Sequence, residues 1–125
     1  MVFALNAYNK DARFAEHTLA RDLTSLDDMR AELDPLVEKV WHYCETTGVR
    51  GRTVTLKVKF SDFQIITRSR SRPGPISDRW TLALISAELL AAQFPMRQGV
   101  RLIGVSLSSL CADTAKLDTQ MTLAL

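Results

Sequence analysis

The sequence has few of the residues that build metal sites or disulfide frameworks, and it lacks long apolar runs. It holds two cysteines, Cys44 and Cys111, and two histidines, His17 and His42, among 125 residues. Two cysteines make neither a disulfide framework nor a zinc-binding spacing, so a His/Cys metal site is not expected. No apolar run reaches the roughly 18–20 residues of a membrane span, and no basic segment precedes the short apolar stretch near the start, as a signal peptide requires. We therefore expect a reducing, cytosolic environment.

Catalytic motifs are also missing. The sequence contains no GxxxxGK[ST], GxGxxG or HExxH pattern, so nucleotide-cradling loops and a zinc-protease helix are not predicted. The adjacent acids Asp27 and Asp28 fall in the first turn of a predicted helix, where they favour the helix dipole rather than a metal ion. The length allows one domain, and 46% hydrophobic with 24% charged residues is an ordinary globular composition that excludes wholesale disorder. No catalytic residue is predicted.

Positive charge is concentrated between Arg50 and Arg72. That segment holds seven basic residues and one acid, Asp62, so it carries six positive charges, while the rest of this chain of net charge +2 carries four negative charges. A basic strip on a mildly acidic body is typical of a surface that binds a polyanion. The alternative is a solubilising surface on which basic residues cluster by chance.

Hydrophobic periodicity predicts the element order β-α-β-β-α-β. Thr24 and Ser77 are predicted to cap helices at their N-termini, and Gly48 to end the first helical region. The expected strands span about 14–23, 52–60, 64–71 and 100–110, and the expected helices span 25–33, 35–47 and about 78–94. Residues 1–11 and the end of the chain carry no clear period and are predicted to be tails or linkers.

Alternation between Arg52 and Phe60 predicts a strand with one buried and one solvated face. The fold class is therefore α+β, with two helices on one face of a four-stranded sheet and an open face opposite. Four single residues also receive predictions. Cys44 is expected to be buried and inert and Trp80 to pack in the core, while His42 should sit at the core edge and His17 should be solvated or contact phosphate.

The open face carries the predicted chemistry. Hydroxyls, arginines and backbone amides near Thr67–Arg72 suit phosphate oxygens, and no aromatic residue sits among them to stack bases as in an RNA-recognition motif. We expect a face that grips nucleic-acid backbone without reading sequence. The ambiguous parity at Ile65-Ile66 leaves open which arginine lies at the sheet edge. The candidates are Arg52, Lys57, Thr67, Arg68, Ser69, Arg70 and Ser71, with Thr18 and Arg101 as secondary candidates.

One long run supports a family resemblance. The segment TVTLKVKFSDFQIITRSRS, Thr53 to Ser71, resembles the little-finger domain of Y-family DNA polymerases, in the bacterial DNA polymerase IV (DinB) group. VRLIGVSLSSL, Val100 to Leu110, resembles the last strand of that domain, and AEHTLARDL, Ala15 to Leu23, is similar to its first strand. The resemblance covers about residues 12–112 and implies four strands backed by two helices. Residues 1–11 lack the family's Ser/Gly-rich entry motif and are expected to be a linker or a tail foreign to the natural protein.

The resemblance implies a non-catalytic domain that holds primer–template DNA and supports lesion bypass, DNA repair and processivity in the bacterial cytoplasm, at the nucleoid. In that family the catalytic carboxylates and two Mg²⁺ ions belong to the palm domain of the polymerase core, so this chain alone is not expected to polymerise nucleotides. Two alternatives stay open. One is the adaptor domain of a catalytically inactive Y-family homologue, and the other is an unrelated α+β nucleic-acid or regulatory module.

The chain ends in Gln120-Met121-Thr122-Leu123-Ala124-Leu125, within a predicted flexible tail at 113–125. This hexapeptide resembles the bacterial sliding-clamp-binding motif Gln-Leu-x-Leu-x-Leu, with Met121 replacing the first Leu at nearly conserved volume. The resemblance implies that Gln120 makes directional hydrogen bonds while Met121, Leu123 and Leu125 enter pockets of the β clamp. A chance match, or packing of the two leucines on the domain, is the alternative.

Overall fold

The computed structural model describes residues 3–5 and 12–112. The strands and helices follow one another along the chain with short connections. In order they are β1 (Phe3–Leu5), β2 (Ala12–Leu23), α1 (Leu26–Thr47), β3 (Val49–Arg50), β4 (Thr53–Phe60), β5 (Ile65–Ser71), α2 (Arg79–Ala91), β6 (Val100–Ser108) and β7 (Cys111–Ala112).

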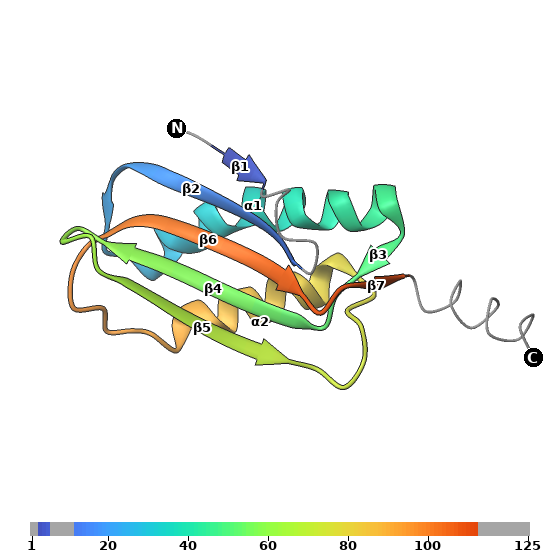
Figure 1. Cartoon of the computed structure of the whole chain (residues 1–125). Helices are drawn as coiled ribbons and strands as arrows, with labels where there is room; N and C mark the ends of the chain where they lie inside the picture. Colours follow the sequence, from blue (N-terminus) through green and yellow to red (C-terminus); the bar gives the residue numbers. More distant parts are fainter. Residues whose placement is uncertain (1–2, 6–11, 113–125) are drawn as a thin grey trace, which may run out of the picture.

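One antiparallel sheet forms the frame of the domain, in the strand order β1-β2-β6-β4-β5. Helix α1 packs on β2 and β6, and α2 packs on β4 and β5, so both helices lie on one face, behind the sheet in Figure 1. The predicted α+β fold is confirmed. Two features were not predicted, namely the edge strand β1 within residues 1–11 and the short antiparallel pair of β3 with β7.

The core lies between the helices and the sheet. Val54, Leu56, Val58 and Phe60 are buried toward the helices while the residues between them are half-buried, as the alternating sequence predicted. Strand β6 differs, because Leu102 and Gly104 are buried although their pairing with Lys59 and Lys57 places them on the face opposite the helices. The reason is position, since β6 lies in the middle of the sheet with β2 and β4 on either side, and neighbouring side chains cover both of its faces.

The first helix corrects two predictions. Its N-cap is Ser25, whose side chain accepts a 3.4 Å hydrogen bond from the Asp28 amide, and not Thr24. The helix also continues through Pro35 instead of breaking there. An internal proline costs about 3 kcal/mol, but buried apolar residues on both sides of it, among them Leu33 and Leu36, each contribute about 1.5–3 kcal/mol. Packing therefore outweighs the lost hydrogen bond.

Of the other helix ends, one is confirmed and the two ends of α2 are shifted from the prediction. Gly48 adopts a left-handed conformation (φ 72°) and its N–H bonds to the Cys44 carbonyl, which confirms the predicted C-terminal cap. The cap of α2 is Asp78, not Ser77, because the Asp78 carboxylate accepts a 2.7 Å hydrogen bond from the Thr81 amide. Helix α2 ends at Ala91, before the predicted residue 94, and turns continue from there to Phe94.

Single side chains give mixed outcomes. Cys44 is buried as predicted, but the predictions for His17 and Trp80 are wrong. His17 is 1% exposed, with Nδ1 3.0 Å from Glu32 Oε2 on α1, because it shares the strand parity of buried Ala15 and Leu19. Trp80 is 70% exposed and lies outside the core. His42 is also exposed.

Within residues 3–5 and 12–112, no helix is long and apolar enough to cross a membrane.

Candidate nucleic-acid interface

The open face of the sheet is lined by hydroxyls and lysines. Thr53, Thr55, Lys57 and Lys59 of β4 lie on the face opposite the helices, because they alternate with the buried residues of that strand. Their cross-strand neighbours share the same face. On β5 these neighbours are Ser71, Ser69 and Thr67, and on β6 they include Ser108 and Ser106. The structure therefore brings the predicted Thr67, Ser69 and Ser71 together with Lys57.

Hydroxyl pairs connect β4 to β5 across this face. Thr55 Oγ1 lies 2.7 Å from Ser69 Oγ, and Thr53 Oγ1 lies 2.9 Å from Ser71 Oγ. A hydroxyl has one donor and two acceptor positions, so in each pair only one member donates to the other. The accepting hydroxyl keeps its hydrogen for another acceptor, and a phosphate oxygen is one such acceptor. Thr53 Oγ1 also lies 3.3 Å from Ser109 Oγ, which extends the second pair by one more hydroxyl.

The two arginines of β5 do not lie on the open face. In the register of β4 with β5, Arg68 lies opposite Leu56 and Arg70 lies opposite Val54. Both β4 residues face the helices, so both arginine side chains point to the helix side of the sheet. Arg68 Nη1 donates to the Thr67 carbonyl at 2.8 Å, and Arg70 Nη1 lies 3.0 Å from Glu88 Oε2 on α2. The register resolves the parity that the sequence left open, since both arginines lie on the helix side of the edge strand β5.

The remaining candidates are spread around the sheet. Arg52, just before β4, and Thr18 on β2 are both exposed. The Arg101 guanidinium lies 4.6 Å from the centre of the Phe63 ring, and the Lys59 ammonium lies 5.4 Å from the same ring. Phe63 is 61% exposed at the β4–β5 turn. These two cations therefore gather on one exposed aromatic ring, a favourable arrangement that the sequence did not predict.

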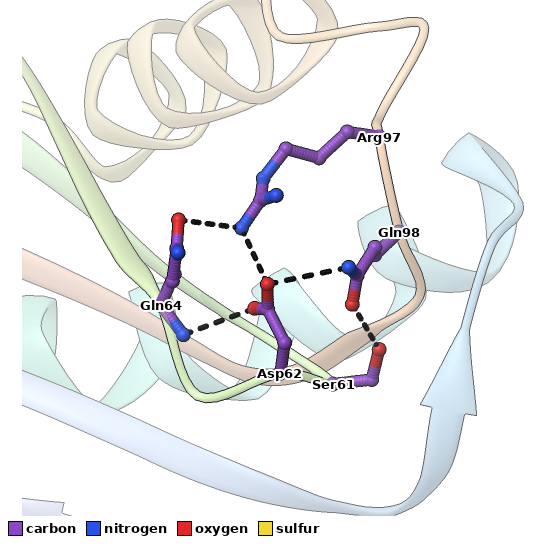
Figure 2. Close-up of polar contacts among 5 residues, drawn as sticks. All are labelled: Ser61, Asp62, Gln64, Arg97 and Gln98. Atoms are coloured by element: carbon purple, nitrogen blue, oxygen red, sulfur yellow. Dashed lines mark hydrogen bonds and ion pairs between the residues drawn. The ribbon is translucent and has the colours of Figure 1, made fainter.

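A polar network holds the β4–β5 turn (Figure 2). Asp62 accepts from the Gln64 amide at 3.1 Å and from Arg97 Nη2 at 2.8 Å. Ser61 donates to Gln98 Oε1 at 2.7 Å. The hydrogen bond from the Gln64 backbone N–H, with a further contribution from Arg97, lowers the pKa of the Asp62 carboxyl below its usual value. The turn is thus tied to the loop before β6, which fixes the hairpin that carries most of the candidate residues.

A second aromatic residue also escaped prediction. Phe14 on β2 lines a shallow hollow on the open face, together with residues of β4, β5 and β6. It shares the face of Glu16 and Thr18 because strand side chains alternate. Because Ala15 is buried toward the helices, the alternation of strand side chains places its neighbour Phe14 on the open face. On the open face, β6, β4 and the edge strand β5 carry no aromatic side chain, as predicted for β4 and β5.

The comparison with protein families decides the identity. The C-terminal domain of the impB/mucB/samB family matches residues 14–123. The chain belongs to this family. Similar proteins include DNA polymerase IV 3 of Mesorhizobium japonicum, 59% identical over 96 residues, which cover 77% of this chain and 26% of that protein. DNA polymerase IV 2 of Agrobacterium fabrum is 47% identical over 106 residues, 85% of this chain and 30% of that protein.

Solved structures share the fold. A Y-family DNA polymerase chimera matches with a TM-score of 0.74 at 16% identity, over 84% of this chain and 30% of that one. The little finger domain of DNA polymerase IV, solved in complex with the β-clamp processivity factor, matches with a TM-score of 0.64 at 21% identity, over 78% of this chain and 86% of that one. The chain is a little finger of the DNA polymerase IV group, which confirms the resemblance.

Family membership excludes one of the two alternatives and leaves the other open. The unrelated regulatory module is ruled out, whereas an active polymerase and an inactive homologue share this domain. The little finger spans 26% and 30% of the length of the two curated relatives it matches first. The predicted clamp-binding residues Gln120, Met121, Leu123 and Leu125 lie outside the residues that the structure describes.

Proposed function

We propose that this little finger is a non-catalytic domain that holds primer–template DNA by its backbone, as part of a DNA polymerase that copies damaged templates. The grip is formed by the open face and by two arginines beside it. Lysines and hydroxyls of β4 and β5 contact phosphates on the face, Arg68 contacts phosphate beside the edge strand β5, and Arg52 contacts phosphate at the start of β4. Contacts of this kind position a duplex without reading its sequence.

The observation that carries the proposal is the row of hydroxyls beside Lys57. Thr53, Thr55, Ser69 and Ser71 form two hydrogen-bonded pairs on the face opposite the helices, within a segment that carries six positive charges. A surface of this type offers donors and positive charge to phosphate oxygens. The middle of the face carries no aromatic side chain, so stacking of unpaired bases has no platform there.

Equilibrium binding tests this proposal. The chain is titrated into a fluorescently labelled primer–template duplex, and anisotropy is read against several unrelated duplex sequences and a single-stranded RNA of equal length. We expect all duplexes to bind within about threefold of one another and more tightly than the RNA. Strong preference for one base sequence, or for the RNA, would contradict the proposal. A double variant, Thr55→Val with Ser69→Ala, removes one hydroxyl pair and should weaken binding to all duplexes alike.

A second proposed activity concerns the hexapeptide at Gln120–Leu125. A solved little finger of DNA polymerase IV forms a complex with the β clamp, which supports the same kind of partner for this chain. Tethering to a clamp would raise the effective concentration of the domain at DNA and so compensate for a weak grip. A peptide of residues 116–125 titrated against a bacterial β clamp should bind, and Gln120→Ala with Leu123→Ala should abolish binding. Equal binding by both peptides would remove this proposal.

A further inference from the structure

Three neighbouring strands place Glu16, Gly104 and Lys57 in one row across the open face. Gly104 of β6 is paired with Glu16 of β2 on one side and with Lys57 of β4 on the other. The Lys57 ammonium lies 3.0 Å from Glu16 Oε2. The two partners are not on adjacent strands, so their ion pair spans the strand that lies between them.

Gly104 makes this span possible. A side chain built on Gly104 would bring its Cβ to 3.2 Å from the Glu16 Cβ and 3.5 Å from the Lys57 Cβ. With hydrogen alone at that position, the surface above β6 is hollowed to about 170 Å³, and both ion-pair partners line the hollow beside Thr55, Thr67 and Ser106. The side chains of Lys57 and Glu16 are 38% and 26% exposed, so solvent ions reach the pair.

The position of the pair matters for an anionic ligand. Lys57 lies on β4 between the hydroxyls of β5 and those of β6, and it lines the hollow together with Thr55, Thr67 and Ser106. A phosphate and a carboxylate are both anions that seek the same ammonium group. While Glu16 holds Lys57, this part of the face is neutral. A phosphate that enters the hollow must displace the carboxylate and then remain close to its negative charge.

We propose that Glu16 competes with DNA phosphate for Lys57 and thereby limits how tightly the little finger holds DNA. This inference rests on the proposed DNA-holding function and assigns a specific role to a carboxylate that the sequence did not single out. The same surface thus contains donors that attract the duplex and one acid that weakens its hold. A domain built in this way releases and regains DNA more readily than its basic composition implies.

The test compares Glu16→Gln with a matched control, Glu38→Gln. Glu38 forms an ion pair with Arg79 at 2.8 Å between α1 and α2, on the helix side of the sheet. Both variants remove one negative charge and release one cation, but only Glu16 faces the hollow. We expect Glu16→Gln to tighten duplex binding about threefold to tenfold and to steepen the salt slope by about 0.9, whereas Glu38→Gln should change affinity less than about twofold.

Lys57→Ala provides the second arm. If Glu16 acts through Lys57, then adding Glu16→Gln to Lys57→Ala should give a gain of less than about twofold, the non-additivity expected of a coupled pair. Circular dichroism checks that each variant is folded, and Glu16→Ala replaces Glu16→Gln if the latter is unfolded. An unchanged affinity of Glu16→Gln, an equal gain from Glu38→Gln, or a full gain in the Lys57→Ala background would overturn the inference alone. Absence of duplex binding by every variant would overturn the proposed function as well.

Discussion

Arg70 on β5 and Glu88 on α2 form an ion pair, with 3.0 Å between Nη1 and Oε2, on the helix side of the sheet. The register of β5 places Arg70 on this side, and Glu88 holds its guanidinium there. Arg68, two residues earlier, leaves the strand on the same side, and its guanidinium donates only to the neighbouring Thr67 carbonyl among the contacts described. Two arginines that look equivalent in the sequence therefore differ in how much charge they offer to DNA.

Single substitutions should reveal that difference. We expect Arg68→Ala to weaken duplex binding about threefold to tenfold and to reduce the steepness of the salt dependence by about one unit, as for the loss of one phosphate contact. Arg70→Ala should change affinity less than about twofold, because Glu88 already neutralises it. Anisotropy titrations at several salt concentrations measure both. Equal losses for the two variants would contradict this assignment.

Gly51 precedes β4 where the chain passes close to β6. A Cβ on Gly51 would lie 2.5 Å from the Leu107 Cγ and 2.8 Å from the Ser108 carbonyl oxygen, so the backbone must shift to accept a side chain. Gly51→Ala should lower the free energy of unfolding by about 1–3 kcal/mol, measured by urea denaturation. Gly74→Ala is the control, since nothing lies within 4 Å of its Cβ; it should change stability by less than about 0.5 kcal/mol.

The turn network predicts a specific sensitivity to acid. The pKa of Asp62 is lowered from its usual 3.8, first by the bond from the Gln64 amide and then by Arg97. A lowered folded pKa means that the ionised carboxylate stabilises the fold above about pH 4, and that this contribution is lost as pH falls through the folded pKa. Asp62→Asn should therefore melt below the wild type at pH 7, with the gap closing as the pH falls below about 4. A gap that stays constant with pH would disagree.

Burial should protect the thiol of Cys44. Desolvation raises its pKa from 9.0 to about 11, against an opposing effect of the Arg50 charge. At pH 8 this reduces the thiolate fraction about a hundredfold, and the thiolate is the species that reacts. In a Cys111→Ser background, iodoacetamide should label the native protein slowly and the urea-unfolded protein rapidly. Labelling at equal rates in both states would contradict the predicted protection.

Local patterns in the sequence were sufficient for most of the fold. The alternation along Thr53–Phe60 and the glycine at 48 each depend on a single element, and both predictions are confirmed. The wrong predictions depend on neighbours that no local pattern contains. Trp80 is apolar but faces away from the core, and α1 runs through Pro35 because packing on the sheet compensates the broken hydrogen bond.

The site was predictable only in part, for a similar reason. Two consecutive isoleucines, Ile65 and Ile66, gave no parity for β5, and only its register with β4 places Arg68 and Arg70 on the helix side. Glu16 and Lys57 are 41 residues apart in the chain and meet across a third strand. The sequence identified the basic segment, whereas the balance between its charges and nearby acids depends on which strands lie side by side.

The salt dependence of duplex binding measures the DNA-holding function itself. Titration of the chain into a primer–template duplex between about 50 and 300 mM monovalent salt gives the slope of log K against log salt. About three to five phosphate contacts predict a slope of roughly −3 to −4, with weak affinity at physiological salt and little change between duplex sequences. A slope near zero, or no duplex binding at low salt, would contradict the account.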